Sequence, residues 1–279
     1  MNHRLAFLTT CAVVALSQNP GVALAEDKPL WELGLGVADL LYPAYRGSSE
    51  TRNYVLPMPL FVYRGQFLRA DKDGVRGIFF DSERVEMNLS LAASPPVSSR
   101  SIAARQDMPD LKPSVEVGPS LDFKLWQSPS HEAKVRLFLP LRGAFTVEKD
   151  AKFIGWQFTP RINVDIDNPP GLPGWTLGML AGPIYGSAKQ HDYFYSVAPQ
   201  YATAQRPAYE AKSGYAGTQL LSALWKRYPA YWVGGFVRYD NLRGSVFEDS
   251  PLVAKKSGFA GGVAISWVLG ESSTRVKVD

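Results

Sequence analysis

The stretch "SVEVGPSLDFKLWQ", residues 114–127, alternates between two kinds of side chain. The odd-numbered positions carry the apolar side chains Val115, Val117, Leu121, Phe123 and Leu125. The even-numbered positions carry Glu116, Ser120, Asp122 and Lys124. Because successive side chains of a β-strand point to opposite faces, this pattern predicts a long strand with one apolar face and one polar face.

The same alternation recurs in "RVEMNLSLA", residues 84–92, and in "FIGWQFTPRINVDI", residues 153–166. A soluble β-sandwich would show it too, so the lengths of the connections must decide the architecture. We expect about twelve strands, near residues 31–38, 53–63, 66–71, 74–80, 84–92, 114–126, 132–147, 153–166, 174–187, 214–226, 230–241 and 257–269.

Long connections alternate with short ones along much of this strand order. The long ones are 39–52, 93–113, 188–213 and 242–256, and the short ones include 64–65, 128–130 and 227–229. Long loops on one side and tight turns on the other are typical of bacterial outer-membrane proteins. We therefore predict an all-β fold, a transmembrane antiparallel β-barrel with short periplasmic turns and longer extracellular loops.

The N-terminus has the features of a secretory signal peptide. Arg4 precedes a largely apolar run over 5–16, and the small-residue site Ala23-Leu24-Ala25 follows it. The run of about 12 residues is shorter than the ~20 that a membrane-spanning helix needs, which argues against an anchor. Cys11 lies too early for a lipoprotein site. We expect cleavage after Ala25, leaving one barrel domain over 26–279 with a periplasmic tail at 270–279.

The bulk composition narrows the function further. Cys11 is the single cysteine, so the chain from residue 26 onward has no thiol chemistry and no disulfide. A net charge of +4 over 279 residues is too small to suggest a nucleic-acid partner. The expected surroundings are outer-membrane lipids.

Aromatic residues gather at the ends of the predicted strands, as in the two interfacial girdles of membrane barrels. For the periplasmic girdle we predict Trp31, Trp126, Trp175, Trp225, Trp232 and Trp267. For the outer girdle we predict Tyr54, Trp156, Tyr185 and Tyr239. The alternative is that aromatic residues simply favour strand ends next to turns.

Charged residues occupy the polar, inward-facing positions of the predicted strands. The basic ones are Lys124, Lys134, Arg136, Arg142, Arg161 and Arg238, and the acidic ones are Glu86, Glu116, Asp122 and Asp165. An open, mildly basic lumen would suit a porin for anionic solutes. If the charges pair with one another instead, they plug the interior. The sequence leaves both interpretations open.

Two prolines lie in the otherwise strand-like stretch "RNYVLPMPLFVYRG", residues 52–65. Proline has no backbone N–H, and residues i and i+2 of a strand direct that group toward the same neighbour. Pro57 and Pro59 therefore remove two donors on one side, which predicts a weak seam between strands. The alternative is that the segment is a loop.

The chain offers little that resembles an active site. His191, Asp192 and Ser196 are the residue types of a catalytic triad, but they fall together on one predicted surface loop. No Cys/His cluster, acidic metal loop or phosphate-binding glycine motif is present. We expect no enzymatic activity, no metal and no cofactor.

Four segments carry a family resemblance: "LGLGVADLLYPAYRGSS" (33–49), "YVLPMPLFVYRG" (54–65), "DYFYSVAPQYATAQRPAYEAKSGYAG" (192–217) and "DSPLVAKKSGFAGGVAISW" (249–267). With them the chain resembles the MltA-interacting protein family, also called MipA/OmpV, of outer-membrane barrels. The residues that match the family's pattern are Pro57, Pro59, Asp192, Tyr193, Phe194, Pro207, Tyr209, Ser250 and Pro251.

The resemblance implies a non-enzymatic role. The family's type member resembles a scaffold that brings a lytic murein transglycosylase together with a bifunctional penicillin-binding murein synthase, and other members are described as adhesins. For a periplasmic partner surface we name the turn 167–174, the turn at Lys226-Arg227 and the tail from Glu271. For an adhesin the candidates are 93–113 and 188–213. The family usually ends within the last strand, so the ending "GESSTRVKVD" predicts a disordered or partner-binding tail.

Overall fold

The computed structural model describes residues 26–71 and 74–278, so the expected signal peptide lies outside the described residues. Fifteen strands are described: β1 (Glu26–Pro29), β2 (Trp31–Pro43), β3 (Thr51–Arg64), β4 (Leu68–Asp71), β5 (Gly74–Asp81), β6 (Val85–Ser94), β7 (Ser114–Gln127), β8 (Ala133–Thr146), β9 (Phe153–Phe158), β10 (Arg161–Asp167), β11 (Trp175–Gly186), β12 (Gly214–Arg227), β13 (Tyr231–Asn241), β14 (Ser257–Glu271) and β15 (Arg275–Val278). One α-helix, α1 (Ala188–Tyr195), and three short 3-10 turns, Ser99–Ser101, Ala103–Arg105 and Pro199–Tyr201, lie in the loops.

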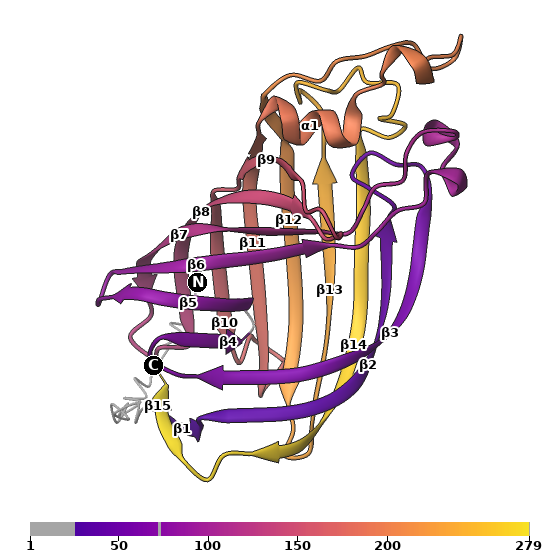
Figure 1. Cartoon of the computed structure of the whole chain (residues 1–279). Coiled ribbons are helices and arrows are strands. Elements are labelled where there is room, and N and C mark those ends of the chain that lie inside the picture. The colour runs from indigo at the N-terminus through magenta and orange to yellow at the C-terminus, as the bar shows by residue number, and fades with distance from the viewer. Residues whose placement is uncertain (1–25, 72–73, 279) are drawn as a thin grey trace, which may run out of the picture.

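The strands from β2 to β14 form one antiparallel barrel, which β14 closes by pairing with β2 (Figure 1). β9 and β10 share one position, because both pair with β8 on one side and with β11 on the other. The barrel therefore has twelve strand positions in the part of the chain that is described, which confirms the predicted class. In the same part, no helix is long and apolar enough to cross a membrane.

The single strand expected over 153–166 is in fact two strands. The break falls at Thr159 and Pro160, between β9 and β10. Pro160 has no N–H to contribute to the ladder, whereas the Thr159 N–H donates to the Pro140 carbonyl oxygen at 3.2 Å. The strand therefore bends at Pro160 without losing its place in the wall.

The tail is not the disordered extension that the sequence suggested. β14 continues to Glu271, and β15 then pairs antiparallel with β1, from Glu26 opposite Val278 to Pro29 opposite Arg275. This two-stranded ribbon lies at the end of the barrel that carries the short turns (Figure 1). We call that end the inner end, and the end with the long loops the outer end.

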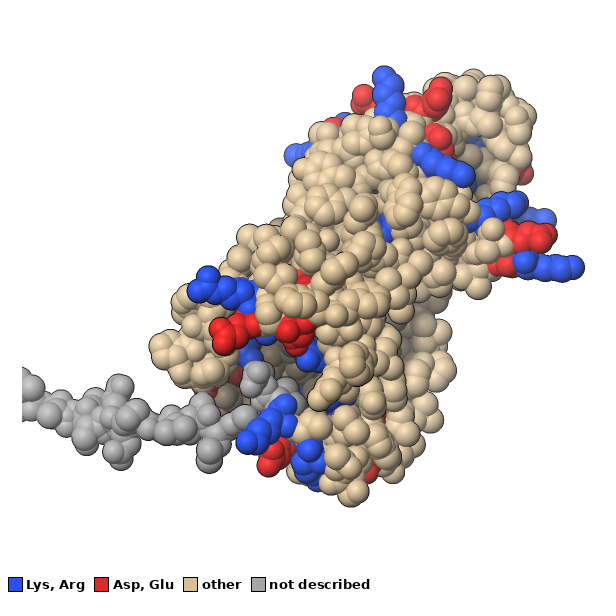
Figure 2. Space-filling view, turned by 60° about the vertical axis from the view of Figure 1, so that its left-hand side comes forward, with Lys and Arg blue, Asp and Glu red and all other residues tan. Residues whose placement is uncertain are grey.

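The outward faces of the strands are apolar, as a lipid-facing surface requires. Leu35, Val237 and Val263 are more than half exposed, although all three lie in the middle of long strands. Charged side chains gather toward the two ends of the molecule and leave a belt with few charges between them (Figure 2). This distribution matches the apolar band of a membrane-spanning barrel.

One part of the wall is incomplete. β3 pairs with β2 along its whole length, but its other edge pairs with β4 only through Tyr63 with Ala70 and Arg64 with Arg69. Among the described residues, 51–62 have no strand partner on that edge. Figure 1 shows β3 and β6 diverging, with the short β4 and β5 between them at one side only.

The two prolines point to this unpaired edge. The Arg64 N–H donates to the Leu30 carbonyl oxygen at 2.8 Å, toward β2. Since backbone groups alternate in direction along a strand, even-numbered residues of β3 face β2, and odd-numbered Pro57 and Pro59 face the other edge. The segment is a strand, so the loop interpretation is wrong, and the expected weak seam coincides with the unpaired edge.

Candidate functional site

The interior of the inner half is filled by ion pairs. Glu32, which is 2% exposed, accepts hydrogen bonds from Arg64 at 2.8 Å, from Arg227 at 3.1 Å and from the indole of Trp232 at 3.4 Å. Arg64 belongs to β3, Arg227 to β12 and Trp232 to β13, so the buried carboxylate on β2 links four strands of the wall. A buried charge needs such partners to offset its desolvation.

A second carboxylate organises the region of the short strands. Glu86 on β6 accepts from Arg69 of β4 at 2.9 Å, from Arg76 of β5 at 3.1 Å and from Asn88 at 2.9 Å. Asn88 also donates to Asp122 at 2.8 Å. Glu86, Arg76, Asn88 and Asp122 are all buried, so this part of the interior is packed with paired polar groups.

The strand register places all ten predicted lumen residues on the interior face. They are Lys124, Lys134, Arg136, Arg142, Arg161, Arg238, Glu86, Glu116, Asp122 and Asp165. Several pair with each other: Arg136 lies 2.8 Å from Asp165, and Arg142 lies 3.6 Å from Glu116. The paired arrangement therefore describes the interior better than an open basic pore.

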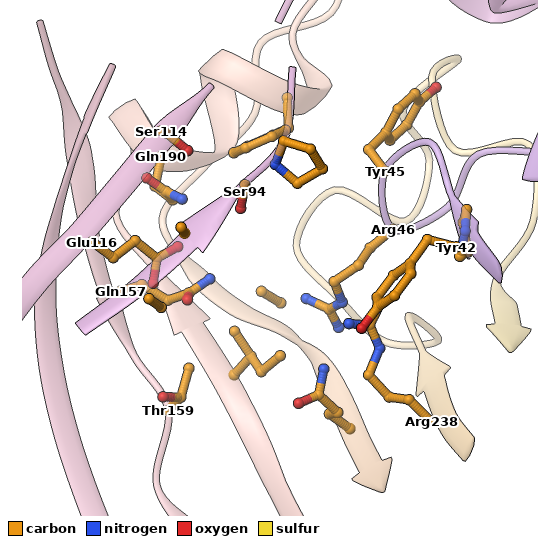
Figure 3. A pocket seen from close by; sticks show the side chains of 18 of the residues that line it. Tyr42, Tyr45, Arg46, Ser94, Ser114, Glu116, Gln157, Thr159, Gln190 and Arg238 are labelled. Carbon is orange, nitrogen blue, oxygen red and sulfur yellow. The ribbon is translucent and has the colours of Figure 1, made fainter. Parts of the chain in front are cut away.

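Above this network, toward the outer end, the barrel encloses a cavity of about 640 Å³. Figure 3 shows Tyr42, Arg46 and Arg238 on one side of it and Glu116, Gln157 and Gln190 on the other. Arg46 and Arg238 both bind Asp240, with Nε to carboxylate distances of 3.1 and 2.9 Å. Two guanidinium groups thus share one carboxylate, which leaves this side of the cavity positively charged.

An apolar cap lies at the outer end and borders the cavity. It is a cluster of buried side chains from four loops and the adjoining strands: Tyr45, Val97, Ile102, Leu111, Ile184, Tyr195, Ala211, Ala216, Leu242 and Phe247. Phe247 is 0% exposed, and its ring stacks on Tyr195 with centroids 3.8 Å apart. Burial raises the pKa of Tyr195 to about 12, although Arg46 opposes the shift. We refer to this cluster and its loops as the cap.

Most of the residues that match the family pattern help to build the cap. Ser250 donates to the Tyr195 carbonyl oxygen at 2.6 Å, and Tyr209 forms a β-bridge with Val197. The Tyr193 hydroxyl accepts from the Lys112 N–H at 2.7 Å, joining α1 to the loop 95–113. Asp192 and Phe194 lie on α1, Pro251 follows Ser250, and Pro207 is exposed in the loop before Tyr209. Pro57 and Pro59 are the exceptions, in β3.

The three triad residue types do not form a relay. Ser196 donates to Asp192 at 2.6 Å, whereas His191 Nδ1 bonds to the Lys212 carbonyl oxygen at 2.6 Å. His191 is buried beneath Phe247, with ring centroids 4.8 Å apart. Burial lowers its pKa, and nearby Arg46 adds to this shift. His191 is a structural residue of the cap.

Seven of the ten predicted girdle aromatics are on the outward face. At the inner end these are Trp31, Trp126, Trp175 and Trp267, and at the outer end Trp156, Tyr185 and Tyr239. The other three face inward. Trp232 binds Glu32, Trp225 lies against the bare backbone of Gly178 and Gly234, and Tyr54 lines the cavity. These three residues lie near strand ends, as girdle residues would, but they occupy the strand positions whose side chains point into the barrel.

Sequence reasoning missed Glu32, Asp240 and Arg46, and it also missed Arg64, Arg69, Arg76 and Asn88 of the ion-pair networks. Glu32 and Asp240 each fall at an inward position of a predicted strand, so the alternation could have identified both. Arg46 comes from the loop after β2, and no periodicity predicts its direction. Among the described residues, no group of His, Cys, Asp and Glu is arranged to hold a metal ion.

The comparison with protein-family models gives a match over most of the chain. A sequence model of the family described as "MltA-interacting protein MipA" matches residues 33–269. No curated protein sequence gives a significant match. Among solved structures, the chain is similar to the P. putida toluene transporter TodX, with 10% identity and a TM-score of 0.31 over 88% of this chain and 68% of that chain. At this TM-score the likeness says nothing about function.

Proposed function

This chain belongs to the MltA-interacting protein family, and on that premise we propose that it is an outer-membrane scaffold for murein enzymes. Its partners would be a lytic murein transglycosylase and a bifunctional penicillin-binding protein, held near the murein layer. Outer-membrane lipids would surround the apolar band. The family match and the barrel fold support the outer membrane as the location, and the cleavage site after Ala25 remains an expectation.

The observation that carries the proposal is the filled interior. The ion pairs around Glu32 and Glu86 lie in the inner half, and the apolar cluster of the cap lies at the outer end. A porin needs a continuous aqueous path, so this arrangement disfavours the porin hypothesis. Stable, anion-selective conductance of the purified barrel in a planar bilayer would revive it.

A partner in the periplasm would bind the inner end, where three surfaces lie together. Lys226 Nζ donates to the Pro173 carbonyl oxygen at 2.9 Å, which joins the turn 168–174 to the β12–β13 turn. The ribbon of β1 and β15 adds Arg275 and Lys277, both exposed and on the same face of β15. These surfaces are the docking candidates, and the ribbon is the first to test because its two basic side chains are exposed on one face.

The test is capture of the tagged, full-length barrel from cells that are cross-linked before detergent extraction. We expect a lytic transglycosylase or a penicillin-binding protein among the captured proteins. Changing Arg275→Glu together with Lys277→Glu should weaken the capture. The matched control, Lys255→Glu with Lys256→Glu, makes the same charge change at the outer end and should leave it intact.

Two results would contradict the scaffold hypothesis. One is recovery of general assembly factors alone from cells that express the intact chain. The other is equal loss of partner in both double variants, which would point to a general effect of charge. The outer loops 93–113 and 188–213 stay as adhesin candidates, although their packing into the cap leaves less of them exposed than free loops would offer.

A further inference from the structure

The unpaired edge of β3 borders an opening in the barrel wall. β5 pairs with β6 only as far as Arg76 opposite Ser90, so the end of β6 also lacks a strand partner on this side in the described part of the chain. β4 and β5 lie along the inner border of the opening. Along its outer border, the Ala103 N–H donates to Glu50 at 3.2 Å and the Arg52 guanidinium donates to Ser101.

The opening lies at the level of the apolar band. Leu56 on β3 is opposite Ala38 on β2, which in turn is opposite Ala264 on β14, in the middle of these long strands. Val55 and Val263 flank this level on the outward face and are 68% and 64% exposed. The opening therefore lies at the level of the apolar band, where the outward-facing Asp39 between Val55 and Val263 is the one charged neighbour on β2.

The prolines lower the cost of an open edge in that setting, while other odd-numbered residues such as Val55 keep an N–H that faces the opening. An unpaired backbone N–H in hydrocarbon is costly, and ordinary residues at 57 and 59 would present two of them. Pro57 and Pro59 have none to present. They also remove two donors that an added strand would need, which weakens pairing along this edge.

The cavity reaches this opening from inside. Tyr54 and Leu56 on one border and Ala92 and Ala93 on the other all line the cavity. Leu56 points inward by register, yet 45% of it is exposed. The cavity and the hydrocarbon region are therefore in contact through a passage with apolar borders.

The side of the cavity away from the opening is charged, whereas the borders of the passage are apolar. Arg46 and Arg238 share Asp240, so their local charge sums to one positive unit. The Arg46 Nη2 atom is buried and has no hydrogen-bond partner. Tyr42 lies beside the Arg238 guanidinium, 5.0 Å from ring centroid to Cζ, and Figure 3 shows the three side chains together. One anionic oxygen group on this side of the cavity would balance the charge.

We propose that the cavity binds a single-chain anionic amphiphile that enters from the bilayer through the opening between β3 and β6. The head group lies between Arg46 and Arg238, and the chain passes Leu56 toward the hydrocarbon. The volume of about 640 Å³ falls within the usual range for ligand pockets. This activity is independent of the scaffold role and needs no murein enzyme.

The test uses the full barrel, refolded into phosphatidylcholine vesicles, with the fluorescent fatty acid cis-parinaric acid as the probe. Its methyl ester has the same chain without the charge. We expect saturable binding of the acid and binding of the ester weaker by about tenfold or more, the loss expected for a charge-assisted hydrogen bond. Arg46→Gln should remove most of this preference for the acid over the ester.

A second pair of variants tests the route. Leu56→Trp fills the opening and should slow or abolish uptake of the acid from the bilayer. Val55→Trp places the same side chain on the outward face of the same strand and should behave as the unchanged chain. Equal binding of acid and ester by the unchanged chain would overturn the head-group assignment without any variant. Equal uptake by the two tryptophan variants would overturn the route.

Discussion

Two parts of the barrel wall differ in how far the backbone groups of their strands are paired. From β11 through β14 and β2 to β3, every neighbour is joined by a long antiparallel ladder. From β3 to β6, the ladder between β3 and β4 has two residue pairs. A membrane demands that backbone donors be paired, and the second part meets this demand at Pro57 and Pro59 by having no donor. A proline in a membrane strand can thus mark where the wall is open.

The two parts also depend differently on the interior ion pairs. Around Glu32, the ladders already hold β2 and β3 together, and the carboxylate adds to them. Around Glu86, the ladder is short, and the pairs with Arg69 and Arg76 attach β4 and β5 to β6. The interrupted wall therefore relies more on side chains than the continuous wall does.

The largest predicted effect follows from removing that carboxylate. Glu86→Ala removes the carboxylate that Arg69, Arg76 and Asn88 share, whereas Arg69 keeps its ion pair with Asp81. We expect a loss of about 3 kcal/mol in the free energy of unfolding, the lower end of the range for breaking a buried ion pair. The urea midpoint of the refolded barrel measures it. Glu83→Ala, an exposed carboxylate three residues earlier, is the control and should change the midpoint little. Similar midpoints for both variants would show that the network does not hold β4 and β5.

The next prediction compares adjacent positions of β3. Leu56→Pro removes an N–H that faces β2 and should cost about 3 kcal/mol or impair barrel assembly. Val55→Pro removes an N–H that faces the opening and should be nearly neutral. Heat-modifiable migration on gels and the urea midpoint report both. If Val55→Pro is as damaging as Leu56→Pro, the edge of β3 is paired after all.

The smallest predicted effect is a pH dependence of stability that arises in the cap and not in the barrel wall. His191 has a lowered pKa in the folded chain, so below about pH 6.5 the unfolded chain binds more protons and the free energy of unfolding falls. The fall ends once pH passes below the lowered pKa. His191 Nε2 is buried without a hydrogen-bond partner, so a proton there would have no acceptor; the charge of Arg46 adds to the cost, and Asp192 offsets it only in part. Comparing urea midpoints at pH 7.5 and 5.5, we expect a smaller difference in His191→Gln. An identical difference would assign the pH response elsewhere.

Strand existence was predictable because alternation is a local property of the chain. The break at Pro160, the inward turn of Trp225 and Trp232, and the pairing of β15 with β1 were not, since each depends on register or on a distant partner. The prolines of β3 predicted a weak seam between strands, but the sequence did not show which edge of β3 lacks a strand partner. The cavity could not be predicted either, because Arg46 comes from a loop and periodicity does not determine the path of a loop.

The most direct test of the open wall is disulfide trapping, which the absence of cysteine after residue 25 makes clean. Asp39→Cys with Val55→Cys joins directly opposed residues of β2 and β3 and should oxidise readily. Val55→Cys with Leu91→Cys spans the opening, with both side chains outward, and should remain reduced under the same conditions. Efficient oxidation of the second pair would place β3 beside β6 and contradict the opening.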